Sequence, residues 1–303
     1  MDQNVRNRLW EIAGREQVYE QEPMSRHTTF RIGGPADFFV APADMEALAG
    51  LVSFCRQEEI PFYVMGNGSN LLVGDKGYRG VIIQVYKNLN RIEITENRIK
   101  AQAGAMLSAV ARKALEHSLT GFEFASGIPG TLGGAVVMNA GAYGGEMKDV
   151  IRQVRVLTPE GDFAQIPGHE MEFGYRTSAA AKRGYIVLEA ELELSPGDAD
   201  QIRGRMEELK EQRVSKQPLD LPSAGSTFKR PEGYFAGKLI MDAGLRGFCV
   251  GGARVSEKHC GFVVNTGGAT AAQVRELMEE VSRRVKEQFG VQLEPEVKML
   301  GEF

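Results

Sequence analysis

Residues 127–145 read GIPGTLGGAVVMNAGAYGG, the stretch from which the fold and the chemistry of this chain are most directly inferred. They include seven glycines and no charged side chain. A solvated linker would not need Ile128, Leu132 and Val136, so we expect the segment to be buried against something. Glycine lets the main chain lie against a flat heterocycle, and backbone amides can bind a pyrophosphate without Lys or Arg. The alternative is a glycine-rich turn packed beside a helix.

A second glycine-rich loop, Gly66-Asn67-Gly68-Ser69-Asn70, follows a predicted strand that ends at Met65. A loop at the end of a strand can present backbone N–H groups to an anion. It is not a Rossmann fingerprint, because Leu71 stands where that motif needs its third glycine, and the chain has no P-loop motif. A tight turn without a ligand is the alternative interpretation.

Outside these loops, short β-rich runs alternate with a few helices. Residues 1 to about 20 are predicted to be a helix with Leu9, Ile12 and Ala13 on its apolar face, followed by a loop at 22–26. Further helices are predicted at 44–58, 107–118, 198–213, 237–243 and 271–289. Strands are predicted at FFVAP, PFYVMG, VIIQVY, the hairpin of RIEI and RIKAQAG, the two runs in VIRQVRVLTPEGDFAQI, HCGFVVNT and EVKML. Few of these strands are joined by helical crossovers, so an α+β fold is favoured over a doubly wound parallel sheet.

The composition is that of a folded globular protein. A net charge of -4 over 303 residues gives no general attraction to nucleic acid or to anionic membranes. The sequence has neither a membrane-spanning apolar run nor a signal peptide, so we expect a cytoplasmic protein without membrane insertion. Cys55, Cys249 and Cys260 lack CxxC spacing and are expected to be free core thiols. The four histidines lack ligand spacing, so no metal is expected.

Taken in order with HTTFRIGGPAD at 27–37, the two glycine loops closely resemble those of the UDP-N-acetylenolpyruvoylglucosamine reductases. This family, also called UDP-N-acetylmuramate dehydrogenases, belongs to the flavoprotein superfamily related to vanillyl-alcohol oxidase. The resemblance continues through FGYRTS (173–178), PSAGSTFKRP (222–231), AGKLIMDAGLRG (236–247), EKHCGFVVN (257–265) and LEPEVKMLG (293–301). Each motif alone is weak, but together they cover about nine-tenths of the chain in the expected order.

The resemblance implies a noncovalent FAD, NADPH as reducing cosubstrate, and reduction of UDP-N-acetylglucosamine enolpyruvate to UDP-N-acetylmuramate for peptidoglycan synthesis. It implies an N-terminal helical segment at 1–26, an FAD-binding domain of two α+β subdomains at 27–197, and a substrate domain at 198–303. The proline-rich stretch KQPLDLPSAG (216–225) independently indicates a boundary after the helix at 198–213. The implied FAD contacts are Arg31, Gly66, Asn67, Gly68, Ser69, Asn70, Gly127, Ile128, Pro129, Gly130, Gly133, Gly134, Asn139, Ala140 and Gly141.

By the same resemblance, Ser226 is the proton donor, while Arg176 and Glu296 match the other two catalytic positions. A serine hydroxyl is a very weak acid, so it can act only because an enolate is a strong base and the proton is already positioned. Arg176 can pair with the substrate carboxylate through its planar fork. Glu296 would oppose developing negative charge unless it is protonated, so we expect a raised pKa from burial and neighbouring negative charge. Without the family context, the alternatives are a turn hydroxyl, a surface ion pair and a strand-edge carboxylate.

Four further residues resemble substrate contacts of the family. Tyr175 corresponds to a phenol near the sugar and Lys216 to an ammonium near the diphosphate, although a solvated linker lysine is the alternative for Lys216. Lys229 and Arg230 follow the serine, and many relatives have asparagine at the second of these positions, where a cation still suits a diphosphate. An extra tyrosine segment of one family branch cannot be placed between 185 and 201, so the chain resembles the shorter branch.

Two other functions are weighed against this one. An oxygen-using alcohol or sugar oxidase of the same superfamily would share the FAD loops but would not require Arg176, Ser226 and Glu296 together. A UDP-sugar binding protein or transferase would use the glycine loops for the nucleotide alone, and it would be purified without a yellow flavin.

Overall fold

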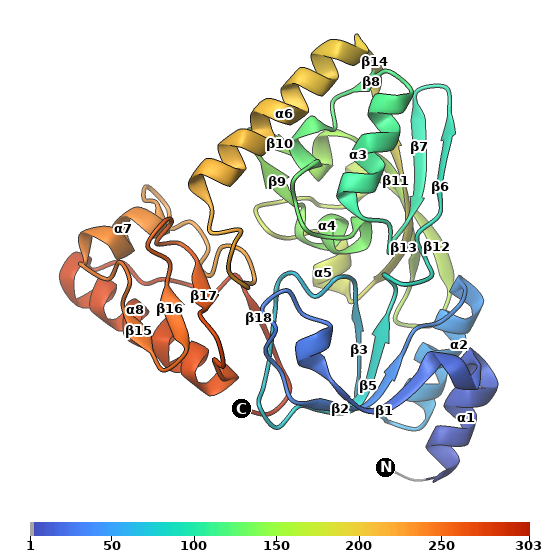
Figure 1. The fold of residues 1–303 in the computed structure, drawn as a ribbon. Coiled ribbons are helices and arrows are strands. Elements are labelled where there is room, and N and C mark those ends of the chain that lie inside the picture. The colour runs from blue at the N-terminus through green and yellow to red at the C-terminus, as the bar shows by residue number, and fades with distance from the viewer. Residues whose placement is uncertain (1–2) are drawn as a thin grey trace. The chain divides into compact units, whose positions relative to one another are not determined.

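The structure of the chain, a computed structural model, describes residues 3–303 (Figure 1). By its internal contacts the chain divides into two compact units. Unit 1 comprises the chain up to Tyr19 together with Phe39–Asn67 and Val81–Arg213. Unit 2 comprises Glu20–Phe38, Gly68–Gly80 and Val214–Phe303. Each unit is therefore assembled from segments that are far apart in the sequence.

One sheet has four strands in the order β1-β2-β5-β3. Its strands are β1 (Val18–Pro23), β2 (Pro35–Val40), β3 (Phe62–Met65) and β5 (Tyr78–Gln84). β3 and β5 pair in parallel within unit 1. Val81, Ile82 and Ile83 in the middle of β5 are fully buried, which is typical of a strand covered on both faces.

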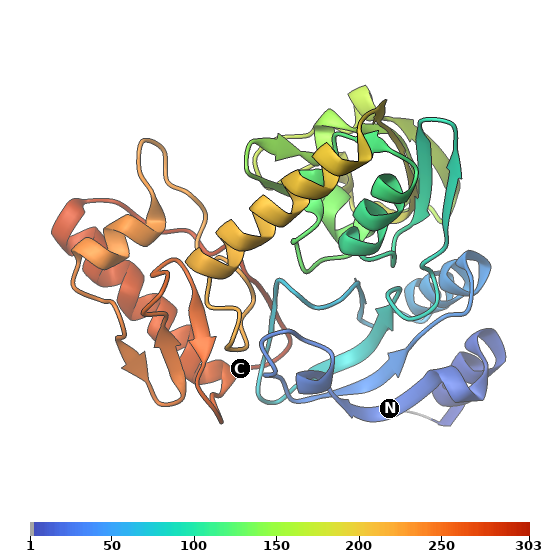
Figure 2. The same ribbon diagram turned by 45° about the horizontal axis from the view of Figure 1, so that its top comes forward.

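The largest sheet lies in unit 1 and is antiparallel, with the strand order β12-β11-β13-β7-β6 (Figures 1 and 2). Its strands are β6 (Ile92–Thr95), β7 (Arg98–Gln102), β11 (Ile151–Leu157), β12 (Phe163–Pro167) and β13 (Ile186–Glu193). Val154 and Val156 on β11 and Leu188 on β13 are completely buried. The register Thr95↔Arg98 closes the predicted hairpin. This antiparallel sheet confirms the prediction of an α+β fold.

Helices α1 to α5 of unit 1 contact strands or one another. α3 and α4 contact β7, and α4 also contacts β13. α2 begins where the Asp44 carboxylate accepts a hydrogen bond of 2.7 Å from the Ala47 N–H, and its predicted stripe of Leu48, Leu51 and Val52 is fully buried. The helices are α1 (Gln3–Ala13), α2 (Met45–Gln57), α3 (Leu107–Glu116), α4 (Leu132–Met138), α5 (Ala179–Arg183) and α6 (Ala199–Lys216), whose last turn belongs to unit 2.

Shorter elements join these helices and strands. Two-residue strands pair as β9 with β10 and as β8 with β14. They are β8 (Leu119–Thr120), β9 (Gly141–Ala142), β10 (Gly145–Glu146) and β14 (Ser195–Pro196). Single 3₁₀ turns are Arg15–Gln17, Met24–Arg26, Glu123–Ala125, Met147–Asp149 and Gly168–Glu170.

Unit 2 is built around the long helix α8, which matches the predicted helix at 271–289. Val274, Leu277 and Val281 on its apolar stripe are completely buried. α8 packs against α7 and against strands β15 and β16 of a three-stranded antiparallel sheet that also contains β17. A separate parallel pair joins β4 to β18. The elements are β4 (Leu71–Val73), α7 (Ala236–Asp242), β15 (Cys249–Val250), β16 (Ala253–Val255), β17 (Val263–Asn265), α8 (Ala271–Phe289) and β18 (Lys298–Leu300).

The start of α8 is fixed by a residue from a distant part of unit 2. The Asp75 carboxylate accepts hydrogen bonds from the Ala271 N–H at 2.7 Å and from the Ala272 N–H at 2.9 Å. Thr270 adds a capping box with Gln273. Because the first N–H groups of a helix have no partner within it, Asp75 both satisfies them and ties its own loop to α8.

Several sequence predictions need correction. The loop predicted at 22–26 begins as strand, because β1 continues to Pro23, and the helix predicted to end at Arg213 continues to Lys216. The N-terminal helix ends at Ala13 rather than near residue 20, because Gly14 adopts φ 85° and the chain continues as β1. Met1 and Asp2, where that helix was predicted to begin, lie outside the described residues. The helix predicted to run to Ser118 ends two residues earlier, at Glu116. Cys249 is exposed and is therefore not a core thiol, whereas Cys55 and Cys260 are buried. Within residues 3–303, no helix is both long and apolar enough to cross a membrane.

Removing the Asp75 carboxylate is expected to destabilise unit 2. Asp75→Ala leaves two helix N–H groups without their acceptor, so the free energy of unfolding should fall by about 1–2 kcal/mol. Asp75→Asn keeps an amide oxygen as acceptor, so its free energy of unfolding should lie between those of the wild type and Asp75→Ala. Denaturant midpoints followed by circular dichroism measure the effect, with the exposed Glu207→Ala as control. An Asp75→Ala midpoint equal to that of the control would show that the contact does not stabilise the unit.

The three thiols are expected to differ in reactivity. Burial raises the pKa of Cys55 to about 12, and burial also raises the pKa of Cys260, so both stay protonated near pH 8. A disulfide reagent should therefore modify one thiol per folded chain quickly and three after denaturation. Cys249→Ser should remove the fast thiol, and a fast thiol that survives this substitution would contradict the assignment.

Candidate functional site

The glycine-rich segment of unit 1 packs closely on the connection that follows β7. Leu132 N–H and Gly133 N–H donate hydrogen bonds of 2.8 Å to the carbonyls of Ala105 and Ala103. A Cβ atom at Gly133 would lie 2.7 Å from the Cβ of Ala103. The absence of a side chain therefore lets α4 approach this connection, while Leu132 is itself fully buried.

The first part of the other glycine loop meets the same segment. A Cβ atom at Gly66 would lie 2.1 Å from the Thr131 hydroxyl oxygen, and the Asn67 amide donates a 3.0 Å hydrogen bond to the Pro129 carbonyl. Thr131 is almost fully buried, so it cannot easily move away. The structure thus brings the two loops into contact within unit 1. Two independent turns, the alternative interpretation, would not need this contact.

The outer side of this assembly is main chain without charged groups. Gly127, Pro129 and Gly134 are exposed, and the nearest atom to a Cβ at Gly134 would be 3.8 Å away. Gly134 is thus exposed backbone with only an ordinary van der Waals neighbour, the Thr131 hydroxyl oxygen, which suits a flat group lying against the main chain. The predicted burial holds for Leu132 but only partly for Ile128, which is half-buried. Gly130, Ala140 and Gly141 are likewise half-buried.

A cation that the sequence interpretation missed lies beside this surface. Arg213 near the end of α6 approaches Gly127, where an added Cβ would be 2.8 Å from its Nε. Its guanidinium also lies 5.7 Å from the centre of the Tyr143 ring. Burial lowers the pKa of Arg213 relative to an exposed arginine, but this residue type stays charged. No local motif marks Arg213, which stands in a run of solvated charges in the sequence.

Arg176 lies at the corner of a tight turn in unit 1. Gly174 and Thr177 exchange backbone hydrogen bonds of 3.0 and 3.3 Å, which leaves Tyr175 and Arg176 at the two corners. Arg176 has φ 55°, a left-handed conformation that is unusual for a residue with a side chain. Tyr175 is 53% exposed, and the Arg176 guanidinium lies 5.2 Å from the centre of its ring. The turn presents both predicted substrate-contacting side chains together.

The remainder of the second glycine loop, residues 68–70, belongs to unit 2 and packs on the segment that begins at His27. A Cβ at Gly68 would lie 2.1 Å from the His27 carbonyl oxygen, and Gly68 has φ 64°. Glycine is therefore required there both by the close contact and by the backbone conformation. The Gly68 carbonyl accepts a 3.3 Å hydrogen bond from Thr29 N–H. Arg31 follows at φ 56° with an exposed side chain, and Ser69 and Asn70 are half-buried.

Ser226 and Glu296 lie on two segments of unit 2 that are joined by their backbones. Glu296 N–H donates a 2.8 Å hydrogen bond to the Thr227 carbonyl, and the Asn70 amide donates one of 3.1 Å to the Glu296 carbonyl. Thr227 is almost fully buried, and its hydroxyl oxygen accepts a 2.9 Å hydrogen bond from Val263 N–H. Ser226 is exposed and Glu296 is half-buried. The structure therefore brings these two residues and the glycine loop together, while Arg176 belongs to unit 1.

The predicted cationic substrate contacts differ in their surroundings. Lys229 forms a 3.1 Å ion pair with Glu294, an exposed contact of small energetic value. The Arg230 guanidinium lies 4.0 Å from the centre of the exposed Phe235 ring. Lys216 is exposed at the last position of α6.

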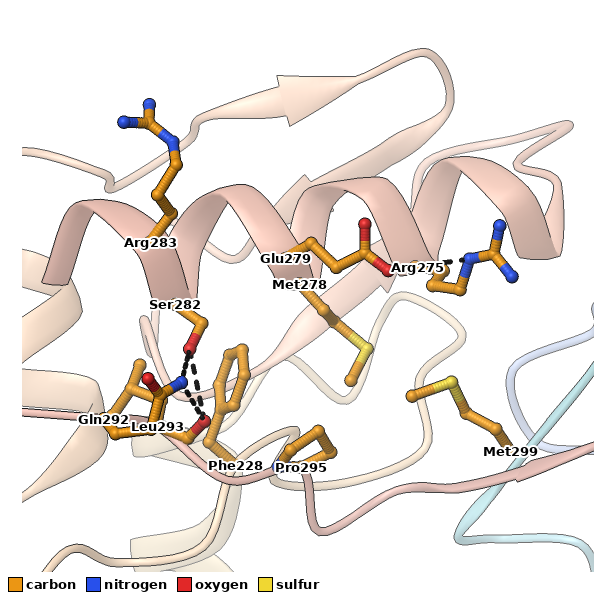
Figure 3. Close-up of a pocket in the computed structure, with 10 residues that line it drawn as sticks. All are labelled: Phe228, Arg275, Met278, Glu279, Ser282, Arg283, Gln292, Leu293, Pro295 and Met299. Atoms are coloured by element: carbon orange, nitrogen blue, oxygen red, sulfur yellow. Dashed lines mark hydrogen bonds and ion pairs between the residues drawn. The ribbon is translucent and has the colours of Figure 1, made fainter. Parts of the chain in front are cut away.

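A pocket of about 360 Å³ lies behind the paired segments, between them and α8 (Figure 3). In Figure 3 the Phe228 ring stands beside Pro295, and these two residues also form an isolated backbone bridge. The Gln292 amide and the Ser282 hydroxyl close one end through a 2.8 Å hydrogen bond. Phe228 and Pro295, which lie within two positions of Ser226 and Glu296 in the sequence, thus form part of the apolar wall of the pocket, together with Met278, Leu293 and Met299.

Models of known protein families match both halves of the chain. A model of the FAD binding domain matches residues 36–166, and a model of the UDP-N-acetylenolpyruvoylglucosamine reductase C-terminal domain matches residues 217–300. The chain is 57% identical to the UDP-N-acetylenolpyruvoylglucosamine reductase of Agathobacter rectalis, with 94% of this chain and 95% of the relative covered. It is 53% identical to the enzyme of that name from Caldanaerobacter subterraneus subsp. tengcongensis, with 98% of each covered.

Solved structures give the same result. The crystal structure of UDP-N-acetylenolpyruvylglucosamine reductase from Thermus caldophilus is similar with a TM-score of 0.77 and 36% identity, over 92% of this chain and 97% of that chain. A glucose dehydrogenase at 13% identity and a TM-score of 0.52 shares the fold alone, over 72% of this chain and 51% of that chain.

The contact between the two loops predicts a specific rescue. Gly66→Ala places a methyl group on the Thr131 hydroxyl, so overpacking should lower the stability of unit 1 by about 1–3 kcal/mol. Thr131→Ala removes the obstructing atoms, so the double variant should be more stable than the sum of the two single effects predicts. Thermal unfolding of the four proteins measures this coupling, and strictly additive effects would show that the loops do not meet as described.

Proposed function

Because the chain belongs to the family of UDP-N-acetylenolpyruvoylglucosamine reductases, we propose that Arg176, Ser226 and Glu296 are its catalytic residues. The family membership rests on 57% identity over 94% of the chain and confirms the resemblance that the motifs indicated. The chain is an FAD-dependent reductase that uses NADPH and converts UDP-N-acetylglucosamine enolpyruvate to UDP-N-acetylmuramate, a precursor of peptidoglycan. Its location in the cytoplasm remains a prediction.

The residues of unit 1 fit an FAD. Gly134 offers exposed backbone without a side chain, and Arg213 supplies a positive charge beside Gly127. Exposed glycine backbone suits a flat ring system, and a neighbouring positive charge suits the pyrophosphate joined to it. A bound FAD would supply the redox chemistry, which is hydride transfer from NADPH to the methylene carbon of the enolpyruvyl group. The individual FAD contacts inferred from the family remain a proposal for the residues of both loops.

The backbone hydrogen bond between Glu296 and Thr227, the residue after Ser226, carries the proposal for the proton-transfer step. After hydride addition, the adjacent carbon carries negative charge shared with the carboxylate and must accept a proton. Ser226 is exposed on a segment whose next residue, Thr227, is buried and hydrogen-bonded, so its hydroxyl can be held in one place. A weak acid then suffices, because the acceptor is a strong base and the donor is already positioned.

Arg176 and Glu296 stabilise the charge in this proposal. The Arg176 guanidinium pairs with the substrate carboxylate, which gains negative charge as the methylene carbon accepts the hydride. Glu296 assists only as a hydrogen-bond donor, so we propose that it carries a proton when substrate is bound. Tyr175, Lys216, Lys229 and Arg230 complete the proposal as contacts for the sugar and the diphosphate.

Anaerobic spectroscopy tests the activity as a whole. NADPH should bleach the flavin of the purified protein, and UDP-N-acetylglucosamine enolpyruvate should restore the oxidised spectrum with formation of UDP-N-acetylmuramate. Reoxidation by oxygen but not by this substrate would favour an oxidase, and a protein that binds no FAD would overturn the cofactor assignment.

Ser226→Ala is expected to separate the two half-reactions. NADPH should still bleach the flavin at the wild-type rate, while reoxidation by substrate should slow by about 10²–10⁴-fold because the positioned proton is lost. Ser223→Ala removes a hydroxyl from the same segment and should leave both half-reactions unchanged. Stopped-flow absorbance measures each step, and rapid substrate-dependent reoxidation of Ser226→Ala would rule out this serine as the donor.

A further inference from the structure

Asn139 occupies the point where the glycine-rich segment turns away from α4. It is 1% exposed and caps the helix in a left-handed conformation with φ 44°, which asparagine tolerates better than most residues. Its amide nitrogen donates to a Glu146 carboxylate oxygen at 2.8 Å and to the Gly174 carbonyl at 3.1 Å. Its amide oxygen accepts a 3.0 Å hydrogen bond from Lys148 N–H. The side chain is therefore directed at the protein.

The Gly174 carbonyl is the start of the turn that carries Arg176. A left-handed residue with a side chain costs about 1–2 kcal/mol, so Arg176 needs support from its surroundings. The Asn139 amide supplies it on one side. On the other side, the hydroxyl of the fully buried Ser178 donates a 2.8 Å hydrogen bond to the Val137 carbonyl. Both ends of the turn are thus fastened to the last turn of α4.

Glu146 adds charge to this arrangement. The β9–β10 hairpin folds back on itself, pairing Glu146 with Gly141, and so returns the carboxylate to Asn139. Lys148 forms a 2.9 Å ion pair with this carboxylate. The hydrogen bond from Lys148, then that from Asn139, and also the positive charge of Arg176 hold the pKa of Glu146 below its usual range. Glu146 is therefore ionised at neutral pH and attracts the Arg176 guanidinium.

We propose that Asn139 is a positioning residue that holds the Arg176 turn against the glycine-rich segment, with Glu146 as its charged partner. This inference rests on the proposed role of Arg176 in binding the substrate carboxylate. It assigns the Asn139 side chain a task inside the protein, which leaves only its main chain for the FAD contact expected from the family. The surface that would carry the FAD and the arginine that meets the substrate are thus parts of one hydrogen-bonded assembly.

Two substitutions separate the hydrogen bonds from the backbone conformation. Asn139→Gly keeps the left-handed conformation and removes all three side-chain hydrogen bonds. Asn139→Asp keeps the shape and the acceptor for Lys148 N–H, but an ionised carboxylate cannot donate to Gly174 and it repels Glu146. Val156→Ala, a fully buried substitution in β11 of the same unit, is the control for a general loss of stability.

The measurement is a double-mutant cycle with Arg176→Ala. Affinity for UDP-N-acetylglucosamine enolpyruvate is read from the perturbation of the oxidised flavin spectrum, and the reoxidation rate is read by stopped flow. Both Asn139 variants should weaken binding and slow reoxidation by about 10–100-fold in the wild-type background, since a small displacement of a positioned group costs this much. In the Arg176→Ala background they should have no further effect, and NADPH should still bleach their flavin. Val156→Ala should act equally in both backgrounds.

The outcomes separate this inference from the function on which it rests. Wild-type protein that shows no substrate-dependent reoxidation would overturn the proposed function itself. The positioning role alone would be overturned if the wild type is active but its Asn139 variants bind and turn over substrate normally. It would also be overturned if the Asn139 variants lose affinity and reoxidation rate by the same factor in the wild-type and the Arg176→Ala backgrounds.

Discussion

Unit 1 depends on a steric constraint: α4 lies against the connection after β7 with no side chain between them at Gly133. Any Cβ at this position would meet Ala103, so the helix can take its place only with glycine there. This placement sets Thr131, which in turn receives Gly66 from the other loop. It also sets the end of α4, where Asn139 and Val137 fasten the turn that carries Arg176. Close backbone packing and the position of a charged side chain are therefore consequences of the same contact.

Unit 2 achieves its positioning by hydrogen bonding rather than by close backbone packing. The Thr227 hydroxyl satisfies Val263 N–H inside the core, while the Thr227 carbonyl accepts from Glu296 N–H. One buried residue thus connects a sheet strand with both segments that carry the proposed catalytic groups. Because an unsatisfied buried N–H costs about 1–3 kcal/mol, this arrangement has little freedom to slip.

Local signals in the sequence were sufficient for the long elements. The apolar stripe and the cap at Thr270 define α8, and Asp44 with Leu48 and Leu51 defines α2. Features that depend on distant partners could not be predicted in this way. The three residues of β4 form a strand because β18, more than two hundred residues later, pairs with them, and Val18–Pro23 is too polar to be distinguished from a helix end.

The same distinction applies to the site. The motifs indicated Ser226, Arg176 and Glu296 through their resemblance to a family, but no local pattern announces that Arg176 has φ 55° or that Arg213 lies beside Gly127. Both features result from tertiary packing. Both concern charged groups, and the contribution of a charged group to binding or catalysis depends on its position. A mobile arginine and a mobile hydroxyl would each lose most of their effect in water. The chain therefore devotes buried polar residues, Asn139 in one unit and Thr227 in the other, to fixing residues that are themselves only partly buried or exposed.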